Sequence, residues 1–218
     1  ELQKLLRGTL NIGVPYSFSP ILTETLLDFA KSYPQVKQNI HYKPMEELMQ
    51  MLERNELDFV LAFKPSTRHD NIESHVLFDN HLAAIVRNGH PLANKDKITI
   101  AELERYDIAL PAKGLQARNA FDRVQSRYFS QFKVRIELNE VNILLKLIKQ
   151  SDLVTVLSEA TTYSEEGVKA ISIDFPDNEM EGCVHLRKDV YRKQSVKEFI
   201  RILSESNAVK QRVNEWLK

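Results

Sequence analysis

The sequence has very little cysteine and no long apolar run. Cys183 is the only cysteine among the 218 residues, so no disulfide can form within the chain. This composition favours a reducing compartment, and we expect a cytoplasmic protein. No apolar stretch approaches the ~20 residues that a membrane-spanning helix requires, and no segment resembles a signal peptide. We therefore expect no membrane partner.

The sequence also lacks an excess of either charge and the common catalytic motifs. Lysine plus arginine and aspartate plus glutamate each number 30, so there is no surplus of cations for a nucleic-acid surface. The 6 histidines are scattered, without the spacing of a zinc site. Glycine-rich nucleotide fingerprints, a Gly-x-Ser-x-Gly elbow and an obvious acid–base pair are all missing. Cys183 lies in an apolar stretch, where a small buried residue is expected rather than a nucleophile. We predict no catalytic residue, no metal site and no cofactor, and hence no enzyme.

What the sequence does contain is one order of elements that occurs twice. Apolar runs and helical periodicity predict strand, helix, strand, helix and strand over residues 10–14, 20–33, 38–43, 45–55 and 57–61. The same order returns over residues 106–110, 116–129, 133–138, 141–150 and 153–157. Further strands are expected over residues 81–86, 168–175 and 183–186, helices over 196–203 and 209–217, and a capping box at Thr99 and Glu102. The predicted fold class is α/β, with two Rossmann-like lobes that each contain a parallel βαβαβ unit.

The two lobes are not expected to be consecutive in the sequence. Residues 79–87 and 182–188 lie on either side of the second βαβαβ unit and are predicted to cross between the lobes. We therefore predict a periplasmic-binding-protein-like arrangement with two crossover strands. Residues 8–85 and 186–218 form lobe I, and residues 86–185 form lobe II. Such a double connection can act as a hinge that closes around a ligand.

The turns after the first strand of each lobe carry polar groups. Ligands of parallel sheets bind outside the carboxyl ends of the strands. In lobe I, the hydroxyls of Ser17 and Ser19 and the amides of the following helix suit a carboxylate, with simple N-capping of that helix by Ser19 as the alternative. Phe18, a large aromatic between serines, must cover something. In lobe II the same position holds Lys113 and Arg118, which either face a ligand or are solvated surface charges. Two such turns across a cleft predict a small anionic ligand.

Several short segments, in their order along the chain, resemble one protein family. They are Arg7–Gly13, Pro20–Leu22, Tyr33–Val36, Glu56–Leu61, His90–Ala93 and Ile98–Leu103. Together they resemble the effector-binding (regulatory) domain of a bacterial LysR-type transcription regulator, over essentially the whole chain. The sequence departs from the family pattern at Asn55, where a glycine is usual, and at residues 150–153 and 157–158 of the second lobe.

The resemblance implies partners as well as a fold. It implies an N-terminal helix-turn-helix domain absent from this chain, through which alone the parent protein contacts DNA, and a linker helix that ends over residues 1–7. It implies antiparallel homodimers, with helix 20–33 of one chain near second-lobe helices of its partner, and homotetramers built from them. It implies a small-molecule effector that alters the oligomer geometry on DNA. Carried over by position, the effector contacts are Ser17, Phe18, Ser19, Pro44, Met45, Phe63, Lys64, Lys113, Gly114, Asn139, Val141 and Asn142.

Two other functions share the two-lobed architecture. An extracytoplasmic solute-binding protein of a transport system has the same kind of cleft, but the missing signal sequence counts against it. An enzyme with a two-lobed cleft, such as a deaminase or dehydratase, would need a convergent acid–base pair. The sequence offers no such pair, so a ligand-sensing regulatory domain is the favoured interpretation.

Overall fold

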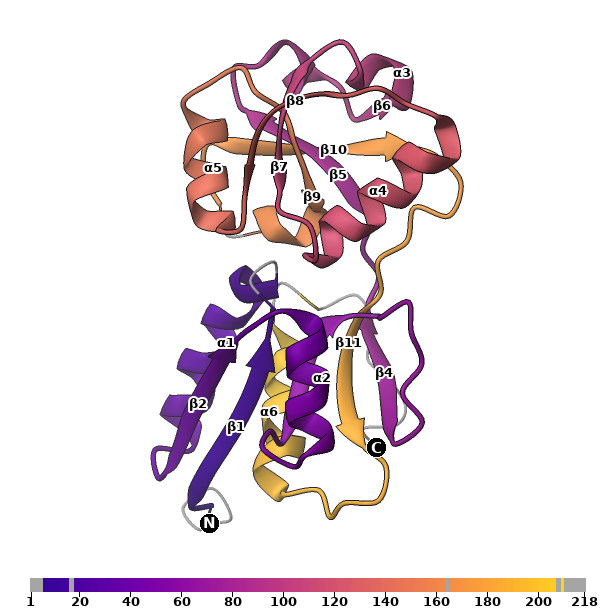
Figure 1. Ribbon diagram of the computed structural model, residues 1–218. Helices are drawn as coiled ribbons and strands as arrows, with labels where there is room; N and C mark the ends of the chain where they lie inside the picture. The colour runs from indigo at the N-terminus through magenta and orange to yellow at the C-terminus, as the bar shows by residue number, and fades with distance from the viewer. Residues whose placement is uncertain (1–5, 16–17, 164, 207–208, 210–218) are drawn as a thin grey trace. The chain divides into compact units, whose positions relative to one another are not determined.

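The computed structural model describes residues 6–15, 18–163, 165–206 and 209, with the side chains of residues 19–21 outside the description (Figure 1). The chain forms two compact units, Glu1–Asp79 with Glu181–Lys218, and Asn80–Met180. We call them unit 1 and unit 2. The chain passes between them at Asp79–Asn80 and again at Met180–Glu181. Both passages lie a few residues before the predicted lobe boundaries, because each strand that follows a passage belongs wholly to the unit it enters.

Unit 1 is a mixed sheet covered by helices. Its strands lie in the order β2-β1-β3-β11-β4, in which β1, β2 and β3 are parallel and β11 is antiparallel to both of its neighbours. The strands are β1 (Gly8–Val14), β2 (Val36–Tyr42), β3 (Phe59–Phe63), β4 (Ile72–Phe78) and β11 (Gly182–Arg187). The helices are α1 (Ser19–Ser32), α2 (Met45–Glu53) and α6 (Gln194–Glu205).

The two faces of β3 show how the helices are distributed. Successive residues of a strand point to opposite faces. The ring of Phe59 packs on Phe199 of α6, with centroids 5.4 Å apart, and Phe199 in turn packs on Phe29 of α1 at 5.3 Å. Val60 instead belongs to a buried cluster with Leu48, Met49 and Leu52 of α2. Helices α1 and α6 therefore cover one face of the sheet, and α2 covers the other.

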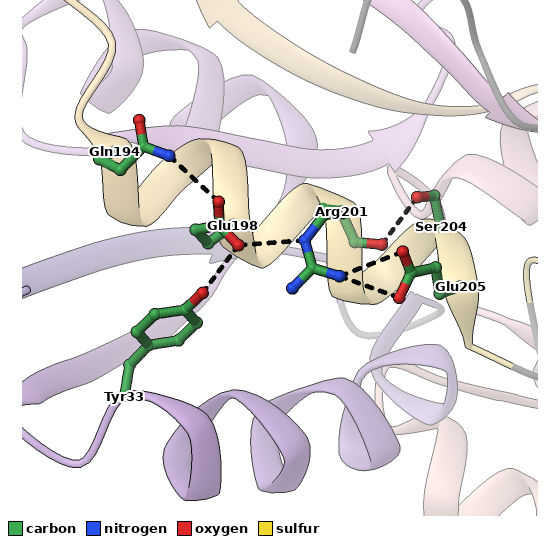
Figure 2. A network of polar contacts seen from close by, with 6 residues as sticks. All are labelled: Tyr33, Gln194, Glu198, Arg201, Ser204 and Glu205. Atoms are coloured by element: carbon green, nitrogen blue, oxygen red, sulfur yellow. Dashed lines mark hydrogen bonds and ion pairs between the residues drawn. The ribbon is translucent and has the colours of Figure 1, made fainter. Parts of the chain in front are cut away.

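A polar network fixes the C-terminal end of α1 to α6 (Figure 2). The buried Tyr33 hydroxyl, just after α1, donates to Glu198 Oε2 at 2.7 Å, and Arg201 Nε donates to the same oxygen at 3.0 Å. Burial raises the pKa of Glu198, but the hydrogen bonds from Tyr33, Arg201 and Gln194 and the charge of Arg201 outweigh it, so this pKa lies below its ordinary value. The carboxylate is thus held charged where the two helices meet.

Unit 2 contains a second sheet with its own helices. Strands β6 (Lys97–Thr99), β10 (Val168–Asp174), β5 (Leu82–Arg87) and β9 (Thr155–Ser158) lie side by side in that order. A parallel bridge between Ile108 and Val154 joins β9 to the parallel pair β7 (Asp107–Pro111) and β8 (Lys133–Leu138). The helical segments are η3 (Pro91–Asn94), α3 (Ile100–Leu103), α4 (Gln116–Tyr128), α5 (Val141–Lys149) and η4 (Glu159–Thr162).

Most predicted elements are confirmed within two residues at each end, and so is the capping box of Thr99 and Glu102. The predicted N-cap of the first helix is wrong, because α1 begins at Ser19 and Phe18 is its N-cap. Strands β4 and β6 are absent from the prediction. The predicted helix 209–217 and residues 1–5 lie outside the described residues, apart from Val209. No described helix is both long enough and apolar enough to cross a membrane.

Candidate functional site

In unit 1, three parallel strands end at one edge of the sheet. Strands β1, β2 and β3 run in the same direction, so their carboxyl ends share this edge. The structure therefore brings the predicted lobe I residues to one side of unit 1, in the segments that follow β1, β2 and β3. The residues described there are Phe18, Pro44, Met45, Phe63 and Lys64. Ser17 and the side chain of Ser19 lie outside the described residues.

Beneath this edge lies a cluster of three aromatic rings. Phe18, Phe63 and Phe78 are each at most 2% exposed. The Phe18 ring centroid lies 5.2 Å from that of Phe63 in an edge-on arrangement and 5.7 Å from that of Phe78. Phe18 packs on the other two rings. This packing explains why an aromatic residue occurs in a turn that otherwise contains serines. Phe18 and Phe63 are therefore part of the core of unit 1, and the neighbouring residues form the accessible surface of this edge.

The accessible groups at this edge are Pro44, Met45 and Lys64. Pro44 is exposed and is the N-cap of α2, and Met45 is half-buried. The Lys64 side chain is 61% exposed, and its Nζ lies 2.7 Å from Glu181 Oε2, while its backbone N–H donates to the Glu181 carbonyl. Glu181 is the first residue of unit 1 after the return passage from unit 2. Lys64 is therefore attached to the end of that passage.

In unit 2, the turn after β7 places a lysine in solvent. Lys113 and Gly114 are exposed, and no described side chain forms an ion pair or hydrogen bond with the Lys113 ammonium. Gly114 has a φ of +93°, a conformation that favours glycine, and its N–H donates to Asn119 Oδ1 at 3.3 Å. Helix α4 then begins with Leu115 as N-cap, which has no side-chain acceptor for the first amides. This turn combines a free cation with a helix N-terminus.

The second turn of unit 2 follows β8 and is joined to the first. The Ala112 N–H donates to the Leu138 carbonyl at 2.8 Å. Glu140 Oε1 accepts from the backbone N–H of Asn142 at 2.9 Å and from its Nδ2 at 3.0 Å, so Glu140 caps α5. Asn139 and Asn142 are exposed, whereas Val141 is 3% exposed and packs in the core. The accessible predicted contacts of this turn are the two asparagines.

Arg118 has a structural role, and neither alternative predicted from the sequence, a ligand contact or a solvated surface charge, is correct for it. Its side chain is 6% exposed. Nε donates to Asp122 Oδ1 at 2.7 Å, Nη1 donates to the Pro111 carbonyl at 3.0 Å, and Glu137 Oε2 lies 3.0 Å from Nη1. The Arg118 hydrogen bond holds the pKa of Glu137 below its ordinary value, and the charge of Lys113 adds to this effect. Arg118 therefore binds β7, β8 and α4 together, and Lys113 is the cation that remains available.

A third strand end of unit 2 was missed by the sequence prediction. Strand β9 ends at Ser158, and the Glu159 N–H donates to the His81 carbonyl at 3.0 Å. Glu159 Oε2 also lies 3.4 Å from His81 Nδ1. Since β7, β8 and β9 are parallel neighbours, Glu159 lies at the same edge as Lys113 and Asn139. Applying the strand-end rule to the predicted strand 153–157 would have found it.

The chemistry of these two edges is that of binding. Among the described residues, no group of three histidine, cysteine or acidic side chains could hold a metal ion. Cys183 is fully buried, and burial raises the pKa of its thiol to about 12, so it is a core residue as predicted. The edges offer hydrogen-bond donors, the ammonium of Lys113, and the starts of α1, α2 and α4, whose N-cap residues make no side-chain hydrogen bond to the first amides.

Comparison with known proteins places this arrangement in context. The family described as LysR substrate binding domain matches residues 3–208. The chain is 27% identical over 175 residues to the transcriptional dual regulator GltC of Bacillus subtilis (strain 168), covering 78% of this chain and 58% of GltC. It is 24% identical over 191 residues to the RuBisCO operon transcriptional regulator of Allochromatium vinosum, covering 86% of this chain and 63% of that protein.

Solved structures resemble the chain along nearly its full length. The CcmR regulatory domain of Synechocystis PCC6803, in complex with 2-PG, has a TM-score of 0.79 at 23% identity, covering 94% of this chain and 99% of that one. The effector-binding domain of QuiR, in complex with shikimate, has a TM-score of 0.74 at 18% identity, covering 95% and 100%. These likenesses confirm the predicted α/β, periplasmic-binding-protein-like fold. The matched proteins are transcription regulators, which bears out the prediction that the chain is not an enzyme. The chain spans only about 60% of the length of the two curated relatives.

Proposed function

The chain belongs to the LysR substrate-binding domain family, and we propose that it is the ligand-sensing domain of a bacterial, cytoplasmic transcription regulator. The proposed ligand is a small anionic metabolite that contacts residues at the strand-end edge of each unit. The observation that carries this proposal is the family match over residues 3–208, together with exposed polar groups at the strand ends of both units. The similar regulatory domains bound to 2-PG and to shikimate support a small-molecule ligand.

The anionic character of the ligand is argued from unit 2. Lys113 is exposed and has no described ion-pair partner, and it lies directly before the N-terminus of α4. The unpaired amides at a helix start favour negative charge, and a nearby ammonium adds to that preference. In unit 1, the phenyl side chain of Phe18 cannot accept hydrogen bonds from the first amides of α1, so these keep their capacity for an anion. Of the predicted contacts, Pro44, Met45, Lys64, Lys113, Gly114, Asn139 and Asn142 are the ones we propose to touch the ligand.

The response to the ligand follows from the two passages between the units. A ligand that contacts both edges binds more tightly to an arrangement of the units that allows both contacts. It stabilises that arrangement over others by the difference in binding free energy. The passages at Asp79–Asn80 and Met180–Glu181 are the pivots of this change. A coupling of about 1–3 kcal/mol is typical of such systems and is sufficient for control of transcription.

The partners are a second copy of the chain and, through another part of the parent protein, DNA. Each unit exposes large apolar side chains: Leu27 on α1 and Tyr42 at the end of β2, and Tyr128, Phe129 and Val134 around α4 and β8. An antiparallel homodimer in which α1 meets second-unit helices of its partner would cover both sets, and two dimers would form the tetramer. A solute-binding protein of a transport system is disfavoured, because the relatives are transcription regulators.

A thermal-shift screen against a library of small metabolites tests the proposal. A specific ligand raises the melting temperature by mass action. Lys113→Ala should weaken the strongest hit about tenfold, or ~1.4 kcal/mol. Lys133→Ala is the matched control. Lys133 is an exposed lysine at the start of β8, and the strand-end edge lies at the other end of this strand. If anionic hits bind equally well to both variants, the ligand does not bind at this edge.

A further inference from the structure

Unit 2 contains a pocket whose lining does not include Lys113, Gly114, Asn139 or Asn142, although its residue Leu82 pairs with Ser158 at the end of β9. Its volume is about 320 Å³, within the range of about 300–1,000 Å³ that is usual for small-molecule sites. One wall is a face of α4, and the other is residues 175–180, the segment that leads from β10 to the return passage. The pocket belongs to unit 2 alone.

The floor of the pocket is apolar. It is lined by Ala120 and Val124 of α4 together with Leu82 and Met180, and all four are at most 9% exposed. The half-buried ring of Phe175 adds to the opposite wall. The floor therefore suits an apolar body that would otherwise be exposed to water.

The two walls carry opposite charges. Arg123 and Arg127 lie on the same face of α4, one turn apart, while Asp177 and Glu179 lie on the segment opposite. Arg127 Nη1 is 3.4 Å from Asp177 Oδ2, and this exposed pair is weak. Arg123 and Glu179 line the same pocket, yet neither side chain pairs with the other or with any described residue. One cation and one anion are left facing the cavity.

The acidic wall is held rigidly in place. Asn178 Oδ1 accepts from the Leu82 N–H at 2.8 Å, and Asn178 Nδ2 donates to the carbonyls of Leu82 and Ile173 at 2.9 Å. The Met180 N–H donates to the Asn80 carbonyl at 2.7 Å. Because the segment is already ordered, a ligand loses little conformational freedom of the protein when it binds.

From this arrangement we infer that the pocket binds a small zwitterion with an apolar body, namely an α-amino acid with a large apolar side chain. The carboxylate pairs with Arg123, the ammonium pairs with Glu179, and the side chain lies on the floor between Ala120 and Met180. A ligand with only one charge leaves one wall unmatched. The bound amino acid would contact residues 175–180, which lead into the return passage. Lys113 does not line this pocket.

Isothermal titration calorimetry of the domain with L-phenylalanine tests this inference. We expect measurable binding, and about tenfold weaker binding of both 3-phenylpropionate, which lacks the ammonium, and phenethylamine, which lacks the carboxylate. Equal binding of either analogue, or no binding of L-phenylalanine up to its solubility limit, would overturn the inference.

Variants locate the binding site independently. Arg123→Ala removes the free cation, and Ala120→Leu fills the floor without a change of charge. Each should weaken L-phenylalanine binding about tenfold, with the melting temperature of the free domain retained. Arg105 is another exposed arginine of unit 2. Arg105→Ala and Lys113→Ala should both leave the affinity for L-phenylalanine unchanged. Loss of binding in Lys113→Ala, or full binding by Ala120→Leu, would contradict the assignment.

Discussion

The two units support the same kind of strand-end edge by different means. In unit 1 the edge rests on three buried rings, Phe18, Phe63 and Phe78. In unit 2 it rests on a buried guanidinium, Arg118, whose hydrogen bonds join β7, β8 and α4. Apolar support depends on volume and close packing, whereas polar support depends on charges that remain paired. The same backbone geometry thus gives edges that should respond differently to substitution.

The largest expected effect separates the two kinds of support. Phe18→Ala leaves a cavity against Phe63 and Phe78 and should lower the free energy of unfolding by about 3–5 kcal/mol. Tyr191→Ala in unit 1 is the control, because that side chain is 87% exposed and its removal should change stability by less than about 0.5 kcal/mol. Urea unfolding followed by circular dichroism gives both values. A loss below about 1 kcal/mol for Phe18→Ala would mean that the aromatic cluster does not support unit 1.

Lowering the pH should reduce the free energy of unfolding mainly through unit 1. Burial lowers the pKa of His185 from 6.5 to about 4, and the residue is fully buried, with Nδ1 2.7 Å from Ser74 Oγ. Between these two values the unfolded chain binds more protons than the folded one, so stability is complete above pH 6.5 and falls as the pH drops towards 4. The loss from this group is about 3 kcal/mol at pH 4. Burial also lowers the pKa of His90 in unit 2, so the stability of unit 2 also falls as the pH drops.

Unfolding of the wild type and of His185→Gln between pH 7 and pH 4 measures this difference. Glutamine can hydrogen-bond in the same place but does not titrate, so the variant should lose markedly less stability than the wild type as the pH falls. Parallel pH profiles for the two proteins would show that His185 is not the group responsible.

The smallest expected effect compares Lys113, in the turn after β7, with Arg118, in the first turn of α4. Arg118→Ala leaves the Pro111 carbonyl and two carboxylates without their donor, and should cost about 1–3 kcal/mol of stability. Lys113→Ala should leave stability within about 0.5 kcal/mol, since its ammonium is exposed and has no described partner. Melting temperatures of the two variants rank them directly. A destabilised Lys113→Ala with an unaffected Arg118→Ala would reverse the assignment of roles.

The sequence predicted the central strands of the repeated units well because β3, β7 and β9 are buried on both faces. Such strands are continuous apolar runs, as in residues 59–63. Strand β4 was missed because it lies at the edge of its sheet, where residues such as Glu73 and His75 interrupt the apolar pattern. The N-cap of α1 was misplaced by one residue, because core packing draws Phe18 inward.

The candidate site was harder to predict than the fold, because side-chain burial is decided by tertiary contacts. Phe18, Phe63 and Val141 occupy the expected positions at the strand ends, yet they are directed into the core. Arg118 looked like a free cation, although Asp122 four residues later on the same helix was a signal that it would be paired. Residues chosen by position alone therefore include both supporting and accessible side chains.

The central claim is that one ligand is held by the strand-end edges of both units. Hydrogen–deuterium exchange of the domain, with and without the anionic hit from the metabolite screen, tests it most directly. The account predicts slower amide exchange in residues 112–116 of unit 2 and, at the same ligand concentration, in residues 43–46 and 63–65 of unit 1. Slower exchange confined to one unit, or away from these segments in both, would contradict it.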